Sequence, residues 1–585
     1  MAVDAKSVES STPVITQRKP TSIMVAESDT KTDPDVLQTD ASEDEEHGEY
    51  MEGTELLMLV LGLLIVMFLC MLDMSIISTV STTDSPGKTA LAYLFQAIPQ
   101  ITSDFSRLED VGWYVGAYQL ASATIQPLAG KLYLYFSVKW TWFTFFVIFM
   151  IGSAICGAAP SSVALIVGRV VGGLGYSGIN NGSMIIFVGA FPLEKRPLYT
   201  AIILGISQIG VVLGPLLGGV FTEYLSWRWC FYINLPLGGV GGLLLLFCKI
   251  PENTKKQPVT LSLLRIVVAK LDLPGFLLFT PAAVMFLMAL QFGSSDYHWS
   301  SPVVIGMFCG AGVGAIIFLA WEWRMGADAM IPLALLAKRT LWTSALNFSF
   351  VMSATLCAAA FMPIFFQSVR GLSPTMSGVY SLASILSQIL FILVSGALMT
   401  KLGYYMPWAL LAGAGGALGL GLMSTWTPST SLGLLLGYQI IYGIRGAGLQ
   451  VGVIAIQSTL KPAEATIGTS MLVFFQNFMV ATFVAIANVV FQETLVSEIR
   501  SIVPPIDPQT AVGAGGSAAA VRALAPAGSA QLAALLDAYT AGFRNVMYLG
   551  VGISIAAFLV AFGMGWVDIR KIEDPKKKNQ LTEMA

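Results

Sequence analysis

Apolar stretches of about twenty residues recur along almost the whole chain, and short polar segments separate them. An α-helix of this length can cross the hydrocarbon core of a bilayer. The pattern therefore predicts an all-α polytopic membrane protein with fourteen transmembrane helices. The spans are expected at 56–78, 111–134, 141–159, 162–190, 199–222, 229–248, 272–292, 301–321, 340–367, 374–400, 405–423, 432–457, 465–492 and 544–566.

The segments outside the spans differ in composition. Residues 1–50 are rich in Ser, Thr, Asp and Glu, and they are predicted to be a disordered tail because they cannot bury a core. Residues 249–271 form a basic linker after the sixth span, and 493–543 form a loop rich in Gly and Ala before the last span. Within that loop, 528–541 is expected to form a short surface helix. Residues 567–585 form a second polar tail.

The lysines and arginines outside the spans fall mostly on one side of the membrane if both termini are cytosolic. Basic loops tend to stay in the cytosol during insertion. The distribution therefore predicts cytosolic termini, an even number of spans, a cytosolic linker at 249–271 and an outer loop at 493–543.

Composition removes several classes of function. Of the 585 residues 55% are hydrophobic and only 11% are charged, against about 25% in soluble domains. Six cysteines lie in or beside spans without a CxxC pair, so no disulfide framework is indicated. The only histidines are His47 and His298, and no phosphate-binding Walker A string occurs. We therefore expect no enzyme, no ATP-driven pump, no cofactor, no metal site and no nucleic-acid partner.

Glycine density singles out the stretch 205–236. Glycines spaced four residues apart form a smooth helix face on which another membrane helix can pack closely. On this evidence alone a packing role is favoured over a functional one. The residues that form the motif are Gly210, Gly214, Pro215, Gly218 and Gly219.

The full string Gly210-Val-Val-Leu-Gly-Pro-Leu-Leu-Gly-Gly219 resembles the antiporter motif in the fifth span of major facilitator superfamily exporters. The following Trp227-Arg-Trp-Cys-Phe-Tyr-Ile-Asn-Leu-Pro236 resembles the fourteen-span drug:proton antiporter branch, particularly its fungal toxin and multidrug efflux pumps. The resemblance covers roughly residues 55–570. It implies a six-helix bundle at 51–248, the linker and two inserted spans at 249–339, and a second six-helix bundle at 340–566.

The resemblance also implies a function. The expected activity is proton-coupled efflux of small amphipathic compounds, such as a toxin, a secondary metabolite or a drug, across the plasma membrane by alternating access. The partners would be the substrate, protons and the lipid bilayer. A vacuolar or siderophore-type carrier on the same scaffold, or a non-transporting membrane sensor, are the alternatives.

Charged residues inside spans are costly and therefore mark candidate sites. Asp73 lies roughly 25 Å from the cytosolic end of the first span, and Arg169 roughly 10 Å below the outer end of the fourth, so the two could pair. An interfacial aspartate and a packing arginine are the alternatives. Leu72-Asp73 and Arg169-Val-Val-Gly-Gly173 resemble motifs of the same branch, and the resemblance implies a role in proton coupling. An arginine favours the ionised form of a neighbouring carboxylate, whereas separation or desolvation favours the protonated form.

Further polar residues lie inside spans. Arg445, in the twelfth span, has no obvious carboxylate partner. It could face the cavity and favour anionic or polar substrates, or it could bond helix carbonyls. The other candidates for the substrate pathway are amides, each of which could equally bridge two helices: Asn181, Gln208, Gln388, Gln450 and Gln476.

Two segments depart from the family pattern. Gly130-Lys-Leu-Tyr-Leu-Tyr-Phe-Ser-Val-Lys139 occupies the loop after the second span, but Leu134 stands where an acidic residue is expected, so Lys131 and Lys139 are explained equally well as cytosolic anchors. Residues 80–96 interrupt a string that is otherwise continuous in the family. They are either a translated intron or gene-model error, or a genuine outer-loop insertion, and sequencing the spliced transcript distinguishes these.

Overall fold

The computed structural model describes residues 53–78, 101, 104–105, 111–250, 252, 260, 267, 270–295, 297–502, 506–514 and 518–571. The predicted tail at 1–50, the interrupting segment at 80–96 and most of the linker at 249–271 lie outside the described residues. Within the described ranges every element is helical, apart from an isolated β-bridge between Tyr404 and Asp568.

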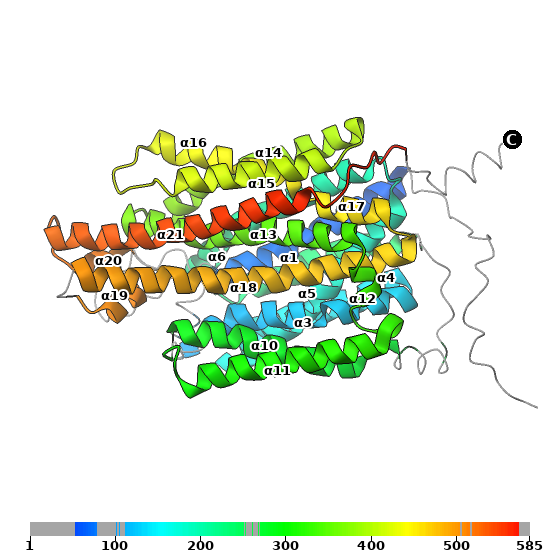
Figure 1. The fold of residues 1–585 in the computed structure, drawn as a ribbon, viewed down its shortest axis with the longest axis horizontal. Helices are drawn as coiled ribbons and strands as arrows, with labels where there is room; N and C mark the ends of the chain where they lie inside the picture. Colours follow the sequence, from blue (N-terminus) through cyan, green and yellow to red (C-terminus); the bar gives the residue numbers. More distant parts are fainter. Residues whose placement is uncertain are drawn as a thin grey trace, which may run out of the picture. The chain divides into compact units, whose positions relative to one another are not determined.

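The helices are drawn in Figure 1. They are α1 (Gly53–Ser78), α3 (Val111–Tyr135), α4 (Val138–Ala158), α5 (Ser162–Ala190), α6 (Arg196–Tyr224), α7 (Trp229–Tyr232), α8 (Asn234–Phe247), α10 (Leu273–Ser295), α11 (Pro302–Met325), η1 (Gly326–Asp328), α12 (Leu333–Leu336), α13 (Arg339–Ile364), η2 (Phe365–Val369), α14 (Pro374–Leu402), α15 (Met406–Met423), α16 (Leu432–Tyr442), η3 (Gly443–Gly448), α17 (Val451–Thr459), α18 (Pro462–Ile502), α19 (Pro508–Ala514), α20 (Ala518–Ala523) and α21 (Ala530–Ala561).

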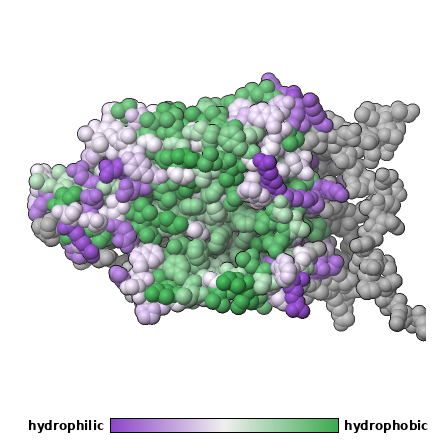
Figure 2. All heavy atoms as spheres, in the orientation of Figure 1, coloured by the Kyte–Doolittle hydropathy of each residue, from purple (hydrophilic) through white to green (hydrophobic). Residues whose placement is uncertain are grey.

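The predicted fold class is confirmed. In the described part of the chain, 12 helices are long and apolar enough to cross a membrane. Helices α3 and α6, of 25 and 29 residues, occupy the positions of the two other predicted spans. Figure 2 shows apolar side chains in a broad band midway along the helices and polar side chains toward both helix ends. This distribution suits a protein whose middle faces lipid.

The helices pack in two sets with a helical hairpin beside them. In the first set α1 packs on α6 and α8, while α3 and α4 both pack on α5. In the second set α13 packs on α18 and α21, and α14 and α15 both pack on η3. Helices α10 and α11 pack on each other, and α10 contacts α3 and α18 (Figure 1). The exact domain boundaries stay a prediction.

The last two long helices differ from expectation. Helix α18 continues to Ile502, and α21 begins at Ala530 and runs without a break to Ala561. The prediction of a separate short helix at 528–541 is therefore wrong. The reason is that strong helix formers follow the Ser529 N-cap, and Leu535 and Tyr539 bury their side chains against the core.

Two spans depart from α-helical geometry. The ninth ends in the π-helical η2, and the twelfth is interrupted by the 3₁₀-helical η3. Non-α backbone at membrane depth is tolerated where protein surrounds it, and all five residues of η2 are buried. In η3, a Cβ atom on Gly446 would overlap the carbonyl oxygen of Gln388 in α14, so glycine is needed for this close approach.

Candidate functional site

Asp73 of α1 and Arg169 of α5 form a buried ion pair. Arg169 Nη1 lies 2.7 Å from Asp73 Oδ2, and the two side chains are 2% and 3% exposed, respectively. The structure thus brings together the two residues whose depths in their spans suggested pairing. Because both charges are shielded from water, each depends on the other for compensation.

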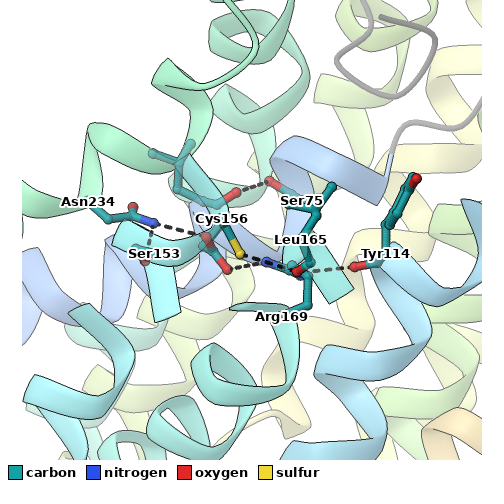
Figure 3. Close-up of polar contacts among 9 residues, drawn as sticks. Ser75, Tyr114, Ser153, Cys156, Leu165, Arg169 and Asn234 are labelled. Atoms are coloured by element: carbon teal, nitrogen blue, oxygen red, sulfur yellow. Dashed lines mark hydrogen bonds and ion pairs between the residues drawn. The ribbon is translucent and has the colours of Figure 1, made fainter. Parts of the chain in front are cut away.

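The second oxygen of Asp73 is also bonded. Asn234, the first residue of α8, donates from Nδ2 to Asp73 Oδ1 at 2.9 Å and to Ser153 Oγ of α4 at 3.1 Å (Figure 3). Both oxygens of the carboxylate therefore accept hydrogen bonds. The carboxylate is thus held by α5 through one oxygen and by α8 through the other.

Arg169 is held by α3 as well as by Asp73. Its Nε donates to the carbonyl oxygen of Tyr114 at 2.9 Å, and its guanidinium carbon lies 4.2 Å from the centre of the Tyr118 ring. Tyr114 in turn donates from its hydroxyl to Ser162 Oγ at 2.9 Å. Residues from α1, α3, α4, α5 and α8 therefore meet at one buried charge pair.

Sequence reasoning missed Asn234, Ser153 and Tyr118 as parts of this site. Asn234 gave one usable signal, because it is a polar residue inside an apolar string that resembles the exporters. Its bonding partner could not be read from that string, since Asp73 lies 161 residues earlier in the chain.

The glycine motif packs against the same part of α1. A Cβ on Gly210 would lie 2.5 Å from the Phe68 carbonyl oxygen, and one on Gly214 would overlap Ser75 Oγ. Ser75, two residues after Asp73, donates to the Gly210 carbonyl at 3.1 Å. A Cβ on Gly218 would lie 3.0 Å from the Ile76 side chain. Pro215 and Gly219 lie in the same helix. The motif thus allows α6 to contact α1 beside the ion pair.

Arg445 forms a second buried polar cluster, within η3. It donates to Gln388 Oε1 at 2.6 Å, to Thr355 Oγ1 at 3.1 Å and to the Tyr442 carbonyl at 3.0 Å. Its guanidinium carbon lies 3.6 Å from the centre of the Tyr442 ring. None of the ion pairs found among the described residues includes Arg445. Within the described part of the chain, its hydrogen-bond partners are neutral groups.

The amides predicted to line a pathway fall into two groups. Asn181 bonds Ser470 of α18, with Nδ2 donating at 2.8 Å, and Gln450 donates to Ser395 of α14 at 3.1 Å. Like Gln388, these two bridge helices. Gln208 of α6 and Gln476 of α18 are half-buried. No cluster of three or more His, Cys, Asp or Glu side chains suited to a metal ion occurs in the described part of the chain.

Comparison with known proteins gives a consistent result. The family model described as Major Facilitator Superfamily matches residues 63–337. The chain is 47% identical to the MFS-type transporter calB of Penicillium decumbens, over 91% of this chain and 92% of calB. It is 43% identical to the efflux pump mokI of Monascus pilosus, over 89% of this chain and 93% of mokI. Its fold resembles the proton:xylose symporter XylE, with a TM-score of 0.56 at 12% identity over 89% of this chain and 98% of XylE.

Proposed function

This chain belongs to the major facilitator superfamily, and from that premise we propose that it exports small amphipathic organic compounds across the plasma membrane, driven by inward movement of protons. The relative mokI, which matches over most of both chains, is named an efflux pump. The observation that carries the proton-coupled part of the proposal is the buried ion pair of Asp73 and Arg169.

The ion pair is suited to couple protonation with helix movement. Ionised Asp73 is compensated by Arg169 and Asn234, which lie on α5 and α8. Protonation would remove the charge that holds Arg169 and would weaken the attachment of α1 to both helices. Helix α1 also packs on α6, and α6 packs on α14 of the second set. A movement of α1 could therefore be transmitted through α6 to the second set of helices.

Contacts between the two helix sets support one end state of an alternating-access cycle. Asn181 bonds Ser470, and a Cβ on Gly130 would lie 2.5 Å from the Ser470 side chain. A Cβ on Gly396 would lie 2.5 Å from Ala201 Cβ. All of these residues lie toward helix ends predicted to be cytosolic, so this conformation is interpreted as closed on the cytosolic side.

The polar side chains suggest how a substrate would be recognised. Gln208 and Gln476 come from different helix sets and are only half-buried, so their amides are the better candidates for direct contact with substrate. Asn181, Gln388 and Gln450 are engaged in bonds between helices and are better candidates for holding the pathway walls. Arg445 would favour substrates with a polar or anionic group, because no carboxylate neutralises it.

The alternative on the same scaffold is a vacuolar or siderophore-type carrier. A tagged full-length protein at the vacuolar membrane would favour that alternative over plasma-membrane export. A non-transporting sensor predicts no gradient-driven movement of any compound.

The decisive experiment is proton-gradient-driven uptake of a fluorescent compound panel into inside-out vesicles. Wild type, Asp73→Asn and the control Asp537→Asn, which removes an exposed carboxylate on α21, are compared at equal protein level. We expect uptake by the wild type and the control, and loss of gradient-driven uptake with retained binding in Asp73→Asn. Full uptake after the gradient is collapsed would contradict antiport, and normal uptake by Asp73→Asn would reject the proton site while leaving export intact.

A further inference from the structure

Three charged side chains are buried together at one end of the α10–α11 hairpin. Asp272 precedes α10, Glu322 lies in the last turn of α11, and Lys131 belongs to the neighbouring α3. They are 1%, 1% and 7% exposed, respectively. Burying charge at this density is expensive unless every group is compensated. The cluster lies on the face predicted to be cytosolic, whereas Asp73 lies in the predicted outer half.

The backbone conformation of Asp272 and its three N–H neighbours make its carboxylate a hydrogen-bond acceptor. It is the one non-glycine residue with positive φ among those the structure describes, at 54°, a conformation that aspartate tolerates better than most residues. Its Oδ1 accepts from Trp321 Nε1 at 2.7 Å and from the Gly275 N–H at 3.1 Å, and its Oδ2 accepts from the Met330 N–H at 2.9 Å. These three N–H groups converge on the Asp272 carboxylate and compensate the cost of burying it.

The carboxyl group of Glu322 accepts fewer hydrogen bonds than that of Asp272. Its Oε2 accepts from the Ile331 N–H at 2.7 Å, but no N–H or O–H of another described residue reaches Oε1. The consecutive amides of Met330 and Ile331 donate to Asp272 and Glu322, respectively, so the two carboxyl groups are held close together. Two ionised carboxylates in contact repel, and a single shared proton removes the repulsion and supplies the missing bond. Because Asp272 already accepts three N–H bonds, a shared proton would reside on Glu322 and would be donated to Asp272.

Lys131 ties this pair to the neighbouring helix. Its Nζ donates to the carbonyl oxygens of Lys270 at 2.8 Å and Asp328 at 2.5 Å, which lie just before α10 and just after α11. One lysine of α3 therefore fastens both ends of the hairpin. Among the described residues, Lys131 is the cation near both carboxyl groups, and the exposed Asp328 lies beside Lys131. With the shared proton the three buried groups are neutral as a set, and without it they carry one uncompensated negative charge.

We propose that Asp272 and Glu322 share one proton and form a proton-binding site, separate from Asp73, that controls how firmly the α10–α11 hairpin docks on α3. Loss of this proton as pH rises leaves a buried negative charge, which is relieved when the base of the hairpin opens to water. This inference holds whether or not the chain is an exporter, since it concerns the protonation and docking of the hairpin alone.

Infrared spectroscopy of the purified full-length protein in lipid tests the proton directly. We expect the carbonyl stretch of a protonated carboxylic acid in the wild type at neutral pH. This band should be lost in Glu322→Gln and weakened in Asp272→Asn, where Glu322 can ionise against Lys131. The control Glu464→Gln removes a carboxylate that is paired with Lys338 at 2.7 Å, and it should leave the band unchanged. An identical band in wild type and in either hairpin variant overturns the shared proton.

Cross-linking tests the docking. Leu132 of α3 packs near Leu271 at the start of the hairpin, so Leu132→Cys with Leu271→Cys reports their contact, in a Cys309→Ser background that removes the exposed cysteine. We expect the cross-linking rate to change several-fold between acidic and alkaline pH in this reporter. The change should disappear when Glu322→Gln is added, because the glutamine amide donates to Asp272 at every pH. An equal pH response with and without Glu322→Gln overturns the proposed control of docking.

Discussion

Asn234 donates a hydrogen bond to Asp73 over 2.9 Å and thereby occupies the carboxylate oxygen that Arg169 leaves open. The amide adds a hydrogen bond to the buried carboxylate without adding a second buried cation. It also connects α8 to α1 at the point where α5 does the same. The ion pair therefore connects several helices. The contribution of each contacting side chain can be tested by substituting it alone.

Removing the amide should loosen the attachment of α1 to α8. In Asn234→Ala the buried carboxylate loses one donor, and a hydrogen bond to a charged group contributes about 1.5–3 kcal/mol. We therefore expect lower thermal stability and slower gradient-driven transport. The measurements are the unfolding temperature in detergent and the initial uptake rate at constant gradient. Asn488→Ala on α18 is the matched control, and unchanged stability and rate in Asn234→Ala would contradict the role of this bond.

Breaking the ion pair from the other side should destabilise the protein. Arg169→Ala leaves Asp73 buried without its counter-ion, which costs about 3–5 kcal/mol. We expect a marked fall in thermal unfolding temperature in detergent, and partial recovery when Asp73→Asn is added, because the second change removes the stranded charge. If the double variant is no more stable than Arg169→Ala, the two residues do not compensate each other.

The contact of α6 with α1 depends on the absence of a side chain at Gly214. In Gly214→Ala the new methyl group overlaps Ser75 Oγ, and overpacking of this kind costs about 1–3 kcal/mol. We expect slower transport and lower thermal stability, both only partly restored by adding Ser75→Gly, because the backbone nitrogen of Ile76 still lies 2.9 Å from the new Cβ. Gly239→Ala in α8 is the control, since nothing lies within 4 Å of its Cβ position. If Gly214→Ala and Gly239→Ala had equal effects, the loss would not come from the close contact between α6 and α1.

The bond between Asn181 and Ser470 should bias the conformational equilibrium. Ser470→Ala removes a hydrogen bond that joins residues 289 positions apart, and a net loss of about 1 kcal/mol shifts a two-state population about fivefold. We expect cysteines placed at the predicted cytosolic ends of α3 and α18 to become more reactive toward a water-soluble reagent. Ser501→Ala, on an exposed part of α18, serves as the control, and unchanged reactivity in Ser470→Ala would argue against a closing contact.

The local part of the structure was predictable because it depends on the length and hydropathy of short stretches. Each predicted span coincides with a helix or with a run of consecutive helical segments. Boundaries were less predictable where no breaker residue stands between a span and its loop. At α21 the chain from Ala530 remains helical into the membrane, because tertiary contacts of Leu535 and Tyr539 extend the helix.

The sequence by itself determined the fold class, the approximate positions of the long helices and the two buried charges that had to find compensation, because a bilayer penalises polar groups according to depth along a single helix. Only the tertiary structure decided which groups supply that compensation. Asn234 and Tyr118 come from helices other than α1 and α5, which carry the ion pair, and Asn234 is 161 residues from Asp73. Their meeting depends on how helices pack, and glycine positions such as Gly210 and Gly446 set that packing through contacts that no local pattern specifies.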